Sequence, residues 1–148
     1  MADISFRDAF VENMQALGWS FPSTFMSDLG TLLTAATAMV TAVQFVGAGA
    51  TMAELASSIT ALGASTAATT AALELILIAG AAYAAYFIGN VIGSILVAAW
   101  RSNAHEFGMV LNWAREQFDR LGQNLMSVVH NIMDSLDMRF PSLLHLLR

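Results

Sequence analysis

The chain has 148 residues, and its 11 acidic and 6 basic side chains give a formal net charge of −5. Only 11% of the residues are charged and 57% are apolar, whereas a soluble domain is typically about 25% charged. This composition excludes an intrinsically disordered chain. The absence of lysine argues against a nucleic-acid-binding protein, and the absence of cysteine excludes a disulfide scaffold. The remaining classes are a membrane protein and a helical protein that can enter a membrane.

No secretory signal peptide is expected at the N-terminus. Residues 1–8 carry more acid than base, and the apolar part of the chain begins only after residue 28. We therefore expect either export by a route that recognises the mature protein, or retention in, or insertion from, the compartment where the chain is made.

An amphipathic helix is predicted over residues 5–18. Ser5 and Asp8 have the spacing of a capping box, and Gly18 is a helix stop signal. Between them, apolar side chains recur at helical spacing: Phe6, Phe10, Met14 and Leu17.

A hydrophobic helix is predicted over residues 23–46, after a turn at Pro22, which cannot lie inside a helix. Residues 29–46 contain no charge. At about 1.5 Å per residue this stretch is about 27 Å long, which is the lower limit for crossing a bilayer.

Residues 51–63 predict a short helix. Thr51 and Glu54 match a capping box, and Gly63 is the expected end. A helix of this length is too short to span a bilayer. The alternative is one weak, Ser/Thr-rich span that continues to Leu73.

The strongest apolar signal belongs to a long hydrophobic helix expected over residues 65–101. The run from Leu75 to Trp100 carries no charge and is long enough to span a bilayer with tilt. Trp100 and Arg101 close this run, and both are side-chain types that anchor a span at the membrane–water boundary.

Residues 103–139 predict a long amphipathic helix, because apolar residues recur three or four positions apart and charged residues fall on the other side. The sequence shows no β pattern, no repeat and no interdomain linker. It therefore predicts one all-α membrane-active domain, residues 1–148, with about five helices. Amphipathic N- and C-terminal helices are expected to surround a central hydrophobic helical hairpin.

Small residues recur every fourth position in the main apolar run, at Ala81, Ala85, Gly89 and Gly93. Such a row lets helix backbones approach closely and pack in lipid. It predicts a zipper that docks the partner arm of the hairpin or another copy of the chain. The alternative is a chance alignment in an alanine-rich helix.

Glu54 and Glu74 are the only charged residues between Asp28 and Arg101. An acidic ring at the mouth of an oligomeric pore favours cations. In the competing interpretation, Glu54 only caps a helix and Glu74 only marks the edge of the apolar segment. Asn90 lies deep in the apolar run, so in lipid it requires a partner on another helix or in a pore lining.

Catalytic chemistry is not expected. His105, His130 and His145 are too far apart for a recognisable metal motif, and His105-Glu106 lacks the second histidine of HExxH. The sequence has no nucleophile elbow, P-loop or cysteine nucleophile. We therefore predict no catalytic residue, no metal and no cofactor.

The organisation of the chain resembles two groups of bacterial toxins. Its hydrophobic part, residues 29–100, is similar to the Ala- and Gly-rich hairpin of channel-forming colicins. Residues 80–93 carry this resemblance and read Gly-Ala-Ala-Tyr-Ala-Ala-Tyr-Phe-Ile-Gly-Asn-Val-Ile-Gly. The small size, the missing signal peptide and the small-residue row resemble small antibacterial pore-forming effectors of type VI secretion. The Lys-rich flanks of colicins are absent, which predicts weaker attraction to anionic lipid.

The resemblance implies an antibacterial pore-forming toxin that depolarises its target by ion leakage, with cation selectivity. Such a toxin is made in the bacterial cytoplasm, is secreted without a signal peptide and acts as a multi-pass protein in the target cell's inner membrane. The implied partners are the lipid bilayer, further copies of the chain in the membrane, a cognate immunity membrane protein and a secretion-tube or chaperone protein. Nucleic acid is not an expected partner.

The alternative is a resident small integral membrane protein without toxin activity, such as an immunity protein, a holin-like protein or a scaffold. Topology rules then require a clear Lys/Arg bias between loops. Arg101, Arg115 and Arg120 give only a faint bias, because acids match them. This weak bias favours the toxin hypothesis.

Overall fold

The computed structural model describes residues 4–25, 27–47, 49–61, 66–102 and 104–121. Its elements in chain order are α1 (Phe6–Ala16), α2 (Leu29–Val46), α3 (Met52–Ala61), α4 (Thr66–Ala79), α5 (Ala84–Ser102) and α6 (Ala104–Leu121). The described residues contain no strand; they contain one isolated antiparallel bridge, between Thr51 and Tyr83. The predicted all-α class is confirmed, with six helices in these ranges where about five were expected.

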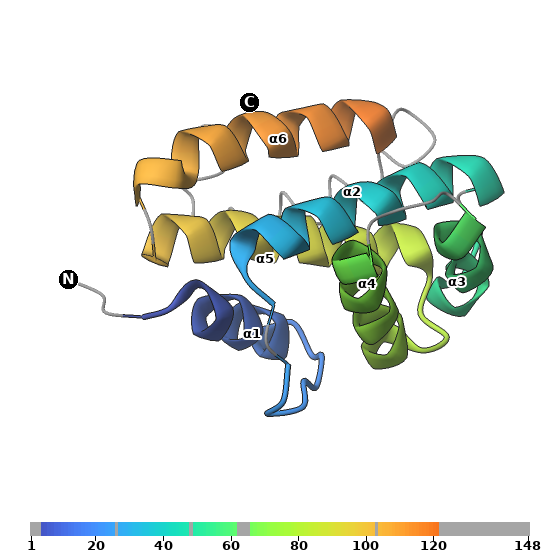
Figure 1. Ribbon diagram of the computed structural model, residues 1–148, viewed down its shortest axis with the longest axis horizontal. Helices are drawn as coiled ribbons and strands as arrows, with labels where there is room; N and C mark the ends of the chain where they lie inside the picture. Colours follow the sequence, from blue (N-terminus) through green and yellow to red (C-terminus); the bar gives the residue numbers. More distant parts are fainter. Residues whose placement is uncertain (1–3, 26, 48, 62–65, 103, 122–148) are drawn as a thin grey trace.

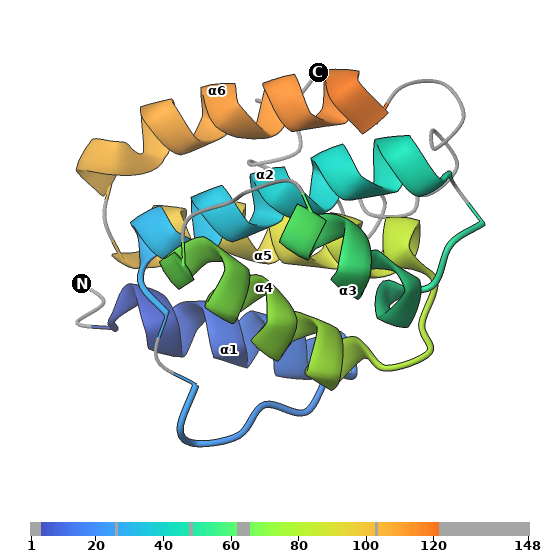
Figure 2. The ribbon, with the colours of Figure 1, turned by 45° about the vertical axis from the view of Figure 1, so that its right-hand side comes forward.

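Helix α5 lies at the centre of the fold. Fifteen of its 19 residues are buried, and it contacts α1, α2 and α6. Figures 1 and 2 show α6 on one side of the α2–α5 pair and α1 on the other side. A helix that is apolar on every side must be covered on every side when it is folded in water, and its neighbours supply that cover.

The helices α1 and α6, called here the covering helices, are amphipathic as the sequence predicts. The buried face of α1 consists of Ala9, Phe10, Val11, Asn13 and Met14, while Asp8, Glu12 and Gln15 are exposed. In α6, Val110, Ala114, Gln117 and Leu121 are buried at helical spacing, while the opposite face exposes Arg115, Glu116 and Asp119. The charged faces of both helices point outward, on opposite sides of the α2–α5 pair.

Both ends of α1 follow the predicted signals. The Ser5 hydroxyl accepts a hydrogen bond from the Asp8 amide at 3.1 Å. At the other end, the amides of Gly18 and Trp19 donate to the carbonyls of Gln15 and Met14, which is the Schellman pattern. Gly18 has φ of 104°, a value that residues with a Cβ rarely adopt.

Helix α2 begins at Leu29, so the prediction of a helix from residue 23 is wrong at its start. Asp28 is the N-cap, and its carboxylate accepts a hydrogen bond from the Thr31 amide at 2.8 Å. The backbone and side-chain hydrogen bonds from Thr31 lower the pKa of Asp28. The helix end is therefore stabilised above the ordinary pKa of an aspartate, and this stabilisation is lost as pH falls through the lowered value.

Helix α3 has the predicted cap. The Glu54 carboxylate accepts hydrogen bonds from the Thr51 amide at 3.2 Å and from the Thr51 hydroxyl at 3.0 Å. The helix runs from Met52 to Ala61. The expected end near Gly63 lies outside the described residues, as does the part of the predicted 103–139 helix that follows Leu121.

The expected single helix over residues 65–101 is in fact two helices, α4 and α5. Gly80 ends α4 with φ of 62°, and its amide donates to the Ile76 carbonyl at 2.8 Å. The Met52 amide then donates to the Ala82 carbonyl, and the Ala84 amide donates to the Ala50 carbonyl, each at 2.9 Å. The break therefore combines a left-handed glycine with backbone pairing to the segment before α3.

The expected central hairpin remains a prediction. Helices α2 and α5 contact each other and run in opposite directions (Figure 1). However, α3 and α4 lie between them in the chain, and α4 packs against both α2 and α3. These contacts do not separate an α2–α5 hairpin from the rest of the bundle.

The break at Gly80 predicts opposite effects for two glycine substitutions. Gly80→Ala is expected to lower the free energy of unfolding by roughly 1–2 kcal/mol, because a Cβ disfavours left-handed backbone while no side chain or backbone crowds that position. Gly30→Ala, in the regular first turn of α2, is expected to raise it by up to about 1 kcal/mol. Urea unfolding measures both, and a stabilising Gly80→Ala would show that the helix continues through residue 80.

Candidate functional site

Two of the described helices, α2 and α5, are long and apolar enough to cross a membrane, judged by length and composition alone. They differ in how much the bundle covers them: 39% of the apolar stretch of α2 is buried, against 83% of that of α5. A core helix of a water-soluble bundle has the same length and composition. The arrangement of polar groups around these two helices therefore matters more than their hydropathy.

The predicted small-residue row is only partly helical. Ala85, Gly89 and Gly93 lie in α5 and are buried, whereas Ala81 is exposed in the turn that precedes α5. Ala81 therefore does not belong to the row, because the helix breaks at Gly80. In this fold the remaining three residues are covered by the bundle, so another copy of the chain reaches them only if α5 is uncovered.

Asn90 is buried in α5, and its side-chain amide donates to the Tyr86 carbonyl at 2.7 Å. This bond lies within its own helix, so Asn90 does not depend on a neighbouring helix for that donor. A different polar pair joins two helices: the Asn13 amide of α1 donates to the Ser94 hydroxyl of α5 at 2.8 Å. This buried bond fixes the register of α1 on α5.

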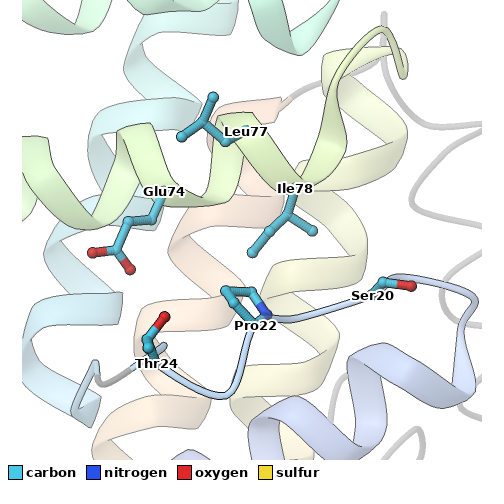
Figure 3. Close-up of a pocket in the computed structure, with 6 residues that line it drawn as sticks. All are labelled: Ser20, Pro22, Thr24, Glu74, Leu77 and Ile78. Carbon is cyan, nitrogen blue, oxygen red and sulfur yellow. The ribbon is translucent and has the colours of Figure 1, made fainter.

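The two acids predicted for a pore mouth lie on different helices. Glu54 is occupied as the cap of α3, which agrees with the competing interpretation of that residue. Glu74 is half-buried on α4, at an open groove of about 510 Å³ between α4 and the loop that follows α1. Figure 3 shows Glu74 and Ile78 extending from α4 toward Thr24 and Pro22 of that loop.

The predicted boundary residues stand at the end of α5. Trp100 is 44% exposed, and its predicted role as an aromatic anchor stays a prediction. Arg101 forms an ion pair with Glu12 of α1, with 2.9 Å between guanidinium and carboxylate. In the folded bundle Arg101 therefore attaches a covering helix to the central helix, a role that the sequence alone does not indicate.

A polar stripe on α2, made of Thr37, Thr41 and Gln44, forms the contact with α6. The Trp113 indole donates to the Thr37 hydroxyl at 2.9 Å. The Arg120 guanidinium donates to the Thr41 hydroxyl and to the Gln44 side-chain carbonyl, and the Gln44 amide donates back to the Arg120 carbonyl. Four hydrogen bonds thus join a candidate span to a covering helix.

The threonines of this stripe are also bonded within α2. The Thr37 hydroxyl donates to the Leu33 carbonyl at 2.8 Å, and the Thr41 hydroxyl donates to the Thr37 carbonyl at 3.0 Å. Each hydroxyl therefore keeps a partner for its hydrogen when α6 is removed. Sequence reasoning missed the stripe as a contact, although the spacing of its three residues places them on one helix face.

An aromatic cluster packs the loop after α1 against the start of α5. Trp19 meets the ring of Phe87 edge to face, with centroids 4.7 Å apart, and Phe21 meets Phe25 in the same way at 4.9 Å. The Arg7 side chain also donates to the Phe25 carbonyl at 2.7 Å. The loop is therefore fixed to α1 and α5 by rings and by two hydrogen bonds from the Arg7 guanidinium, to the carbonyls of Phe25 and Ser23.

The chain matches no family model, and no curated protein or solved structure is significantly similar to it. The described residues contain no group of three or more His, Asp or Glu side chains that could hold a metal ion.

The α2–α6 contact predicts that Thr37→Val weakens the bundle. The Trp113 indole loses its acceptor, so the free energy of unfolding is expected to fall by about 1 kcal/mol. Thr34→Val is the matched control, because Thr34 is exposed and its hydroxyl donates to the Gly30 carbonyl of its own helix. Urea unfolding, with Trp113 emission followed in a Trp19→Phe, Trp100→Phe background, measures the difference. Equal effects of the two variants would remove the stripe as a structural contact.

Proposed function

We propose that this chain is an antibacterial pore-forming toxin that inserts α2 and α5 into the inner membrane of a target cell and depolarises it by ion leakage. The observation that carries the proposal is the contact between two apolar helices of spanning length, whose only charged residue is Arg101 at the end of α5, in a bundle whose covering helices turn their charges outward. A resident membrane protein does not need such a cover, because lipid is as apolar as the protein core.

The transfer of α5 from the bundle to lipid replaces one apolar environment with another. Little hydrophobic free energy is lost on that step, and the cost lies in the polar groups that are transferred with the helices. Those groups are few. The Asn90 amide and the hydroxyls of Thr37 and Thr41 are bonded within their own helices, and these bonds survive removal of the cover.

Detachment of the cover breaks a small number of directional contacts. On the α6 side they include the hydrogen bonds of Trp113 and Arg120, and on the α1 side they include the Asn13–Ser94 bond and the Glu12–Arg101 ion pair. Each such hydrogen bond contributes about 0.5–1.5 kcal/mol net. Contact with a bilayer compensates for a loss of this size when it buries apolar surface of the released helices.

Two helices cannot enclose a water-filled channel, so the pore consists of several copies of the chain. Gly89 and Gly93, which are buried in the folded bundle, are expected to support close packing of α5 with another helix in the membrane. The resemblance to type VI secretion effectors adds the remaining parts of the proposal: synthesis in the bacterial cytoplasm, secretion without a signal peptide, a chaperone or tube protein in transit and a cognate immunity membrane protein in the producing cell.

Planar lipid bilayers test the proposed function directly. The purified protein, with no partner present, is expected to produce unitary conductance steps. Membrane association without conductance would contradict the pore and leave the resident membrane protein as the better hypothesis. No membrane association at all would identify α5 as the core helix of a water-soluble bundle.

Selectivity is expected to depend on Glu74. Residues 29–100 carry two acids and no base, so a negative field at the pore mouth is expected to attract cations and repel anions. Solution ions screen this field over a Debye length of about 8 Å at physiological salt. Reversal potentials in asymmetric KCl should therefore show cation preference that increases at low salt and falls in Glu74→Gln. Glu116→Gln, on the outer face of α6, is the control. Anion selectivity, or an unchanged reversal potential in Glu74→Gln, would remove Glu74 from the pore.

Assembly is expected to depend on the small-residue row. Gly93→Leu keeps the helix apolar and blocks close approach of a second backbone, so conductance should be strongly reduced. Reconstitution from detergent into liposomes separates this effect from any repacking of the folded bundle. Ala98→Leu, which adds a similar side chain outside the row, should conduct normally. Parental conductance of both Gly93→Leu and Gly89→Leu would mean that the row reflects composition only.

A further inference from the structure

One end of the bundle, called here the apolar end, exposes large apolar side chains. Phe45 is 84% exposed and Val46 39% in the last turn of α2, and Tyr83 is 65% exposed and Tyr86 45% where α5 begins. Figures 1 and 2 place the end of α2 and the start of α5 at the same end of the molecule. The end is therefore a surface formed by two connections that lie far apart in the sequence.

Backbone hydrogen bonds hold these two connections together. The Ala84 amide donates to the Ala50 carbonyl, and the Met52 amide donates to the Ala82 carbonyl, both at 2.9 Å. These two bonds join the main chain of residues 50–52 to that of residues 82–84. The exposed rings therefore stand on a fixed support.

Charge is distributed unevenly between the two ends of α2 and α5. The residues from 29 to 53 and from 75 to 100 carry no charge. The carboxylate of Glu54, in the first turn of α3, is hydrogen-bonded in the α3 cap. The opposite ends of the two helices carry Asp28 and Arg101, with exposed Glu106 close by at the start of α6. Among the described residues, α2 and α5 therefore bring no charge to the apolar end, and α6 brings the base Arg120, bonded to Thr41 and Gln44, beside the exposed acid Asp119.

We propose that the apolar end is the membrane-docking surface, and that its occupant is the boundary between headgroups and hydrocarbon of a lipid bilayer. Phenol rings favour this boundary because one edge is polar and the ring is apolar. An anionic bilayer repels a chain of net charge −5 that has no lysine, and this repulsion is weaker at the apolar end, where α2 and α5 carry no charge and Arg120 of α6 offsets Asp119. Docking there also places the ends of both candidate spans at the lipid before the bundle opens. The inference deepens the proposed function and depends on it for this last step.

The test compares a double variant, which carries Phe45→Ser and Tyr83→Ser in one chain, with the single control variant Met109→Ser. All three side chains are at least half exposed, so the fold is expected to tolerate the changes, and circular dichroism with urea unfolding verifies this. Met109 lies on α6, away from the apolar end. Binding is measured by sedimentation with vesicles of phosphatidylcholine, with and without phosphatidylglycerol.

The double variant is expected to bind vesicles at least ~10-fold more weakly than the parent, since two apolar side chains no longer enter the boundary, while Met109→Ser binds normally. Once reconstituted into liposomes from detergent, which bypasses docking, the double variant should conduct like the parent. This pair of results supports the docking surface. Parental vesicle binding by the double variant would overturn it, and would leave the proposed pore untouched.

Two further outcomes separate the alternatives. If sedimentation without vesicles shows that the parent is a dimer and the double variant a monomer, the apolar end is an interface between copies, and the docking assignment is wrong. If the parent binds vesicles through the apolar end but never conducts after reconstitution, the docking surface stands and the proposed function fails. The two proposals therefore fail in different experiments.

Discussion

The covering of α5 is the constraint on which the rest of the fold depends. Apart from Arg101 at its end, α5 carries no charge and 15 of its 19 residues are buried, so its neighbours must cover most of its surface from water. This accounts for the amphipathic character of α1 and α6, and for the packing of the loop after α1 through Trp19 and Phe87. Helix α2 completes the cover and is itself less covered.

Apolar burial alone does not determine how the covering helices are aligned, because it has no direction. Alignment comes from a few polar contacts: Asn13 with Ser94, Arg101 with Glu12, and Trp113 with Thr37. Each joins a covering helix to a candidate span. Such contacts add specificity more than stability. These polar contacts thus align the covering helices in one arrangement. When the helices separate, water can replace the hydrogen bonds that are lost.

Local signals predict much of the fold. Capping boxes mark the starts of α1 and α3, and Gly18 marks the end of α1, because these signals act over one or two helical turns. The break at Gly80 escaped prediction, since its surroundings are alanine-rich and favour a helix, while the pairing of Ala50 and Met52 with residues 82–84 is a tertiary contact. The start of α2 is at Leu29 and not at the expected residue 23, because Asp28 is the N-cap of this helix.

The candidate site is less predictable than the fold, because its contacts join residues far apart in the chain. Thr37, Thr41 and Gln44 dilute the apolar character of α2 in the sequence, and only the position of α6 shows them as a contact surface. Arg101 is a side-chain type that anchors membrane spans, and the sequence indicates only that role. Its ion pair with Glu12 follows from the position of α1 in the fold.

The backbone pairing between residues 50–52 and 82–84 also brings together the two ends of the segment from Met52 to Ala82. Because its two ends are adjacent, this segment, which contains α3 and α4, is a closed insertion between the two longer helices α2 and α5. The entropy of closing such an insertion changes slowly with its length. A change in the length of this segment is therefore expected to have little effect on how the end of α2 meets the start of α5.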